Sequence, residues 1–99
     1  MIERYVLLKL SSDMANEAGR RELVATASRL FPTMDGVSDF KIALQSEGSG
    51  DCKWDLVMTI GLADAEAVKR YMACPIHADF DGELAMMLED IESLSFTRA

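Results

Sequence analysis

Residues 71–80 read YMACPIHADF and mark an interruption in a long helical pattern. Pro75 has no N–H to donate and a φ angle that suits the first turn of a helix, so it ends one helix and can start the next. His77 lies just inside the second helix, on the face that carries apolar residues at three- and four-residue spacing. These apolar residues are Phe80, Leu84, Met87, Leu88 and Ile91. We therefore expect His77, the only histidine, to point towards the core.

The two helices that meet at this break are predicted to bring a tyrosine close to this histidine. Asp64 is a capping residue for the first of them, whose inward stripe includes Tyr71. The helix of residues 80–90 follows the break. Tyr71 and His77 are therefore expected to converge near a buried surface, which is the only place where the sequence indicates chemistry.

An earlier helix is predicted over residues 14–31. Residues 11–13 offer side chains that can cap its first turn, and Pro32 stops it. Gly19 weakens its first half, because glycine is a poor helix former. The Asp35–Gly36 pair that follows is a turn signal.

Four stretches are predicted to be strands. Residues 2–10 and 54–62 are rich in large apolar residues on both faces, which is typical of strands covered on both sides. Residues 37–45 alternate between apolar and polar side chains, and residues 46–53 between these strands read as a flexible loop. The last strand, residues 91–98, places Leu94 and Phe96 on one face and Ser93, Ser95 and Thr97 on the other.

The order of these elements is βαββαβ with the second helix broken in two, which predicts an α+β, ferredoxin-like fold with a four-stranded antiparallel sheet. We expect residues 1–99 to form a single domain. Helices cover only one face of such a sheet, yet two strands are apolar on both faces. A homodimer through the helix-free sheet face, giving a dimeric α+β barrel, is therefore predicted.

Composition restricts the partners and the location of the chain. The net charge of −7 argues against binding to nucleic acid or to an anionic membrane surface. No apolar run approaches the length of a membrane span, and the first residues form a poor signal peptide. Cys52 and Cys74 have no metal-site or disulfide spacing, so we expect a cytoplasmic location. One histidine with scattered carboxylates does not form a metal site.

The chain resembles the stress-responsive A/B barrel domain (Dabb) family over nearly its whole length. The resemblance rests on Leu7-Leu8-Lys9-Leu10, on Gly36-Val37 with Phe40, on Trp54-Asp55-Leu56, and on Tyr71, Pro75, His77 and Phe80. The last four match the family's Y-x-x-H-P-x-H-x-x-F pattern. Most members are uncharacterised small dimers, so the resemblance implies a dimeric barrel that binds a small organic ligand near His77, without a cofactor.

The resemblance also implies an enzymatic alternative. A characterised polyketide cyclase of this family closes a linear polyketide by an intramolecular aldol step without a cofactor, using a tyrosine and a histidine at the positions of Tyr71 and His77. A cyclase- or isomerase-like enzyme with these two catalytic residues is therefore the second hypothesis. An antibiotic-biosynthesis-type monooxygenase, from the wider superfamily, is the third.

Three residues depart from the family pattern: Arg4, Cys74 and Ser95 replace a histidine, a histidine and an acidic residue. Arg4 interrupts an apolar strand face and either binds a ligand carboxylate or pairs with an acidic side chain. His77 either contacts a ligand or packs on Phe80 as a structural residue, and Asp81 is spaced to pair with it. The residues expected to contact a ligand are Arg4, Tyr71, His77 and Phe80.

Overall fold

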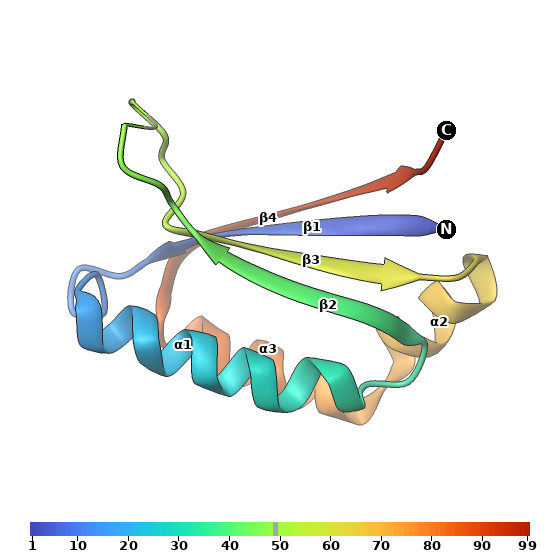
Figure 1. Cartoon of the computed structure of the whole chain (residues 1–99). Helices are drawn as coiled ribbons and strands as arrows, with labels where there is room; N and C mark the ends of the chain where they lie inside the picture. Colours follow the sequence, from blue (N-terminus) through green and yellow to red (C-terminus); the bar gives the residue numbers. More distant parts are fainter. Residues whose placement is uncertain (49) are drawn as a thin grey trace.

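A four-stranded antiparallel sheet carries the helices on one of its faces (Figure 1). This computed structural model describes residues 1–48 and 50–99. Its elements are β1 (Ile2–Leu10), α1 (Glu17–Leu30), the 3-10 turn η1 (Phe31–Thr33), β2 (Val37–Leu44), β3 (Leu56–Leu62), α2 (Ala65–Ala73), α3 (Pro75–Ala85) and β4 (Leu88–Thr97). The predicted ferredoxin-like α+β fold with a broken second helix is confirmed.

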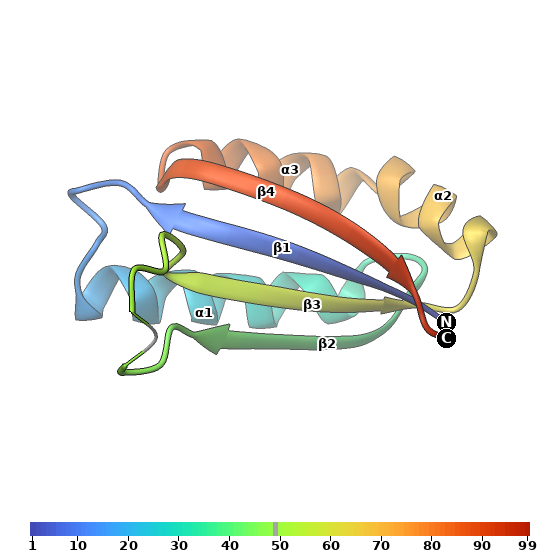
Figure 2. The same cartoon turned by 90° about the horizontal axis from the view of Figure 1, so that it is seen from above.

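The strand order is β2-β3-β1-β4, so β1 and β3 occupy the centre of the sheet (Figure 2). Arg4 of β1 lies opposite Ile60 of β3 on one side and Ser95 of β4 on the other. Side chains alternate between the two faces along a strand, so these three residues share the face that the helices cover. The charged side chain of Arg4 therefore lies on a central strand, on the face that the helices cover.

The core lies between this face and the helices. Alternate residues of β1 and β3 are buried there, as are the inward stripes of α1, α2 and α3. Phe31 links the layers, because its ring stacks on Phe40 with centroids 5.1 Å apart and meets Phe80 edge-on at 4.6 Å. The largest fully buried side chains are those of Tyr71, Phe31, Phe80, Leu8, Leu10, Leu23, Leu56, Met58, Ile60 and Leu62.

The opposite, helix-free face is formed by Tyr5 and Leu7 of β1, Val57 of β3, and Leu94 and Phe96 of β4. The register places Tyr5 beside Leu94 and Leu7 beside Val57. Leu94 is 41% exposed and Phe96 56% exposed, so large apolar side chains reach solvent in the isolated chain. The connection from β2 to β3 rises on this side (Figure 1); the loop predicted there, residues 46–53, includes Ser49, which lies outside the described residues.

The start of the first helix differs from the prediction. α1 begins at Glu17, and its cap is Asn16, whose Oδ1 accepts a hydrogen bond from the N–H of Gly19 at 2.7 Å. Residues 11–13 therefore do not supply the cap. Gly19 is buried, and a Cβ there would lie 1.9 Å from the carbonyl oxygen of Met14. The glycine is needed for this close approach of two backbone segments, in addition to its cost in helix propensity.

The prediction of the last helix from apolar periodicity was also wrong about where the helix ends. α3 covers Pro75–Ala85 and not residues 80–90, and β4 begins at Leu88 and not at residue 91. The N–H of Met87 donates to the carbonyl of Leu84 at 2.8 Å, a three-residue spacing that tightens and ends the helix. Leu88 then pairs with Leu10 in the sheet.

The third strand is shorter than predicted, because it begins at Leu56 and leaves Trp54 outside it. The residue between them, Asp55, has its side chain turned to the end of β1, where its carboxylate accepts a hydrogen bond from the N–H of Leu10 at 2.8 Å.

Within the described residues, no helix is long and apolar enough to cross a membrane.

We expect Gly36→Ala to destabilise the fold by at least about 1–2 kcal/mol, the cost of a left-handed conformation for a residue with a Cβ. Gly36 has φ +87°, and its Cβ would lie 2.3 Å from the carbonyl oxygen of Ala67 at the start of α2. Gly48→Ala is the matched control, since its φ is +79° and no atom lies within 4 Å of its added Cβ. Urea unfolding should show the larger loss for Gly36; equal losses would mean that the contact with Ala67 costs nothing.

Candidate functional site

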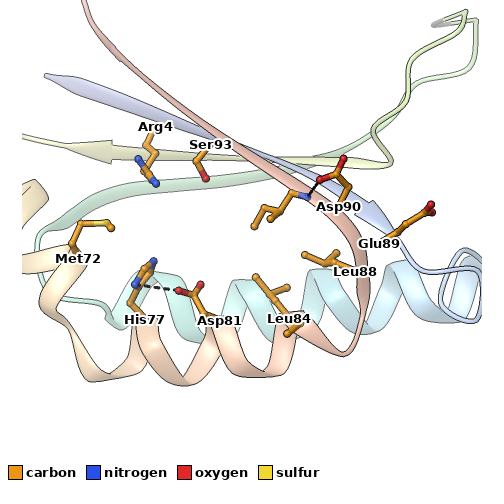
Figure 3. Close-up of a pocket in the computed structure, with 11 residues that line it drawn as sticks. Arg4, Met72, His77, Asp81, Leu84, Leu88, Glu89, Asp90 and Ser93 are labelled. Carbon is orange, nitrogen blue, oxygen red and sulfur yellow. Dashed lines mark hydrogen bonds and ion pairs between the residues drawn. The ribbon is translucent and has the colours of Figure 1, made fainter.

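A cavity of about 460 Å³ lies between α3 and the sheet (Figure 3). Four elements contribute to its wall. Its lining residues are Arg4 of β1, Met72 of α2, His77, Asp81, Leu84 and Ala85 of α3, and Leu88, Glu89, Asp90, Ile91 and Ser93 of β4. Apolar side chains form much of this wall, and a few polar groups converge on it, as in many small-molecule sites.

His77 reaches the cavity because the chain breaks at Cys74, whose ψ of 127° is extended, and Pro75 then starts α3. The side chain of His77 is 14% exposed, and its Nδ1 lies 3.7 Å from Oδ2 of Asp81, one turn further along the helix. The ring centroids of His77 and Tyr71 are 4.6 Å apart. The sequence-predicted convergence of these two residues is therefore present in the structure.

Tyr71 lies deeper than His77, with 1% of its surface exposed. It lines a small space of about 30 Å³ that shares Arg4, His77 and Ser93 with the larger cavity. Burial raises the pKa of Tyr71 to about 12, although the nearby positive charge of Arg4 opposes part of this rise. The phenol therefore keeps its proton at neutral pH and can act as a hydrogen-bond donor.

Arg4 extends from β1 into the cavity, across from His77 (Figure 3). Its Nη1 donates to Oγ of Ser95 at 3.1 Å. Its Nε is buried and has no hydrogen-bond partner in the described part of the chain. None of the described carboxylates lies within 4.0 Å of this guanidinium, so Arg4 carries its charge without an acidic partner.

The acidic residues of the cavity wall, in contrast, each lie beside a basic group. Asp81 faces His77, Glu89 Oε2 lies 4.0 Å from Nζ of Lys9, and Asp90 pairs with Lys53. The bond from Lys53 lowers the pKa of Asp90. Glu89 and Asp90 thus each lie beside a lysine and Asp81 beside an imidazole, whereas no described acidic side chain lies beside Arg4.

Two of the residues singled out in the sequence lie away from the cavity wall. Phe80 is 1% exposed and packs in the core against Phe31, so it supports α3 without lining the cavity. Cys74 is buried at the junction of α2 and α3. Backbone N–H groups, that of Asp35 first and those of His77 and Ile76 after it, lower the pKa of its thiol, although its burial opposes them.

Sequence reasoning did not identify the part of the wall that β4 supplies. The alternation of the last strand separates Ser93 and Ser95 from Leu94 and Phe96, and this pattern was the available signal. A serine face directed at the helices indicates a polar space in the interior, because an apolar core would be lined by apolar side chains. Within residues 1–48 and 50–99, no group of three or more histidine, cysteine or acidic side chains is placed to hold a metal ion.

Fold and cavity together define a small ferredoxin-like protein with a ligand-sized space between its sheet and its third helix. The sequence model of the stress responsive A/B barrel domain (Dabb) matches residues 2–97. The chain therefore belongs to this family. No curated protein matches the chain in sequence.

Solved structures share the fold at low sequence identity. The Arabidopsis thaliana protein At3g17210 superposes with a TM-score of 0.86 at 15% identity, over 100% of this chain and 96% of that one. A Dabb family protein with a ferredoxin-like fold from Mesorhizobium loti gives 0.85 at 18% identity, over 99% and 96%. A dimeric ferredoxin-like protein of unknown function from Thermobifida fusca gives 0.82 at 15% identity, over 98% and 90%.

Proposed function

We propose that this protein binds a small organic molecule in the cavity beside His77. The observation that carries the proposal is the cavity itself, whose volume of about 460 Å³ lies in the usual range for ligand sites. Leu84, Leu88 and Ile91 offer it an apolar wall, and polar groups of Arg4 and His77 face the same space. Such a combination supports burial of an apolar body and orientation by a few hydrogen bonds.

We also propose that the chain forms a homodimer through the helix-free face. The exposed side chains of Leu94 and Phe96, together with Leu7 and Val57, make an apolar surface on the central and outer strands. Packing this surface against a second copy about a two-fold axis would remove it from water. The Thermobifida fusca protein with the same fold is described as dimeric, which is consistent with this arrangement.

The ligand can be sought directly by native mass spectrometry of the freshly purified protein. We expect a species heavier than the bare chain or its dimer by the mass of one small molecule per subunit, and release of that molecule on denaturation. A Leu84→Trp variant, which fills the cavity from α3, should purify without the compound. If the wild-type protein carries no compound and no small organic molecule stabilises it against heat, the binding function is wrong.

We expect His77→Ala to weaken ligand binding about tenfold while changing the free energy of unfolding by no more than about 1 kcal/mol. His77 faces the cavity, and its side chain retains 14% exposure, so its removal enlarges a space that already exists. Thermal melts with and without the co-purified compound measure both quantities. Asp79→Ala, at an exposed position of the same helix, is the control and should change neither.

The opposite result would assign His77 a structural role. In that case His77→Ala would lower the melting temperature strongly, and the stabilising shift produced by the compound would be the same as in the wild-type protein.

A second candidate function is catalysis without a cofactor, of the cyclase or isomerase kind. The distance of 3.7 Å between His77 and Asp81 favours it, because a carboxylate beside an imidazole can orient it as a general base. Tyr71, 4.6 Å from His77 between ring centroids, would donate a hydrogen bond from its hydroxyl to a substrate carbonyl oxygen. Conversion of the co-purified compound by wild-type protein, but not by His77→Ala or Tyr71→Phe, would support this function; an unchanged compound would argue against it.

A further inference from the structure

We infer that the ligand is an organic acid whose anionic group binds Arg4 and whose apolar body lies along the wall formed by α3 and β4. This inference rests on the proposed binding function and specifies the ligand's chemical class. It follows from the ion pairs of the cavity wall: Glu89 and Asp90 each lie beside a lysine and Asp81 lies beside His77, whereas Arg4 has no acidic neighbour among the described residues.

The state of the Arg4 side chain points to a missing hydrogen-bond acceptor. Its Nε is buried and has no partner among the described residues, and a buried donor without an acceptor is costly, more so when it carries charge. Its Nη1 bonds to a neutral serine hydroxyl, Oγ of Ser95, which does not neutralise the guanidinium. A ligand carboxylate in the cavity would supply the missing negative charge and would accept hydrogen bonds from the terminal nitrogens of the guanidinium.

The geometry of the side chain favours a carboxylate over a neutral carbonyl group. A guanidinium presents two parallel N–H donors that match the two oxygens of a carboxylate. Ser93, on the same face of β4 as Ser95, lines the cavity beside Arg4 and offers a further hydroxyl donor (Figure 3). A lysine or a histidine at this position would not present the same fork.

The remainder of the wall describes the body of the ligand. Met72 is 51% exposed and Ile91 46% exposed, and both line the cavity together with Leu84 and Leu88. These aliphatic side chains would be removed from water by an alkyl or similar apolar group, which adds binding free energy in proportion to the area covered. Nearby carboxylates would disfavour a second negative charge, so a mono-acid fits best.

Octanoate and octanamide form a pair of probes that differ in charge and share the same chain. Each is titrated at pH 7, where octanoate is ionised, into the ¹⁵N-labelled full chain, and amide signals are followed by NMR. We expect octanoate to shift the signals of Arg4, His77 and Ser93, with at least about tenfold tighter binding than octanamide. In Arg4→Gln the two probes should bind alike, whereas Arg29→Gln, an equal charge change on exposed α1, should keep the preference.

Arg4→Lys provides a second variant, which keeps the charge and loses the fork, and it should retain only part of the preference for octanoate. Equal binding of the two probes to wild-type protein would overturn the inference while leaving the binding function intact. Shifts confined to the helix-free face, or no shift with either probe, would also overturn it. The binding function itself is decided separately, by the compound that co-purifies.

Discussion

Replacing Phe80 with alanine is expected to lower the free energy of unfolding by about 3–5 kcal/mol, the usual cost of truncating a fully buried phenylalanine. Phe80 is 1% exposed, and its ring meets Phe31 edge-on with centroids 4.6 Å apart. It joins α3 to the layer of α1 and η1, so the cavity left behind would lie between three elements that cannot easily collapse onto it. Urea unfolding measures the loss.

Met86→Ala is the control, because Met86 follows α3 directly and is 86% exposed. Its free energy of unfolding should change by less than about 0.5 kcal/mol. A loss well below about 1 kcal/mol for Phe80→Ala would show that Phe80 is not part of the core.

Leu94→Glu is expected to weaken the homodimer about a hundredfold or more, because it would place a charge without a partner in an apolar interface. Leu94 projects from β4 onto the helix-free face beside Tyr5 and is 41% exposed in the isolated chain. The folded subunit should tolerate the glutamate, since this side chain contacts solvent there. Sedimentation velocity at micromolar concentration should show a dimer for the wild-type protein and a monomer for the variant.

Met86→Glu adds the same charge at an exposed position off this face and should leave the dimer intact. A wild-type protein that sediments only as a monomer, or a Leu94→Glu variant that remains dimeric, would contradict the proposed interface.

Local signals were enough to predict the elements that are bounded by strong capping or turn residues. Asp64 caps α2 as expected, with its side chain accepting the N–H of Ala67 at 2.9 Å. The Asp35–Gly36 turn and the bounds of β1, Ile2–Leu10, also agree with the sequence-based expectation. The cap and the turn depend on neighbouring residues, which is why the sequence is sufficient for them.

The errors at the end of α3 and at the start of β3 occur where a tertiary contact decides the boundary. Met87 and Leu88 continue the apolar spacing of α3, and both are partly buried against the core. Periodicity cannot tell a helical position from a strand position when each would bury the same side chain. The pairing of Leu88 with Leu10 decides the matter, and this partner lies at the other end of the chain.

In the candidate site, too, relations between residues close in sequence could be predicted, and relations that depend on strand pairing could not. His77 and Tyr71 are close in sequence, so helix geometry was enough to bring them together. The relation of Arg4 to Ser95 depends on the pairing of the first strand with the last, and the sequence showed Arg4 only as an interruption of an apolar face. Phe80 was expected to contact a ligand because it belongs to the same motif, but the structure places it on the core side of α3.

The Nε of Arg4, which has no hydrogen-bond partner in the described part of the chain, also has a consequence for the abundance of the protein in a cell. A ligand that binds only the folded chain adds stability that grows with its free concentration, by about 2.7 kcal/mol at a hundredfold excess over the dissociation constant. Proteases remove chains in proportion to the time they spend unfolded. If an acid satisfies Arg4, the lifetime of the protein would follow the supply of that acid, and its abundance would report the metabolite without any change in gene expression.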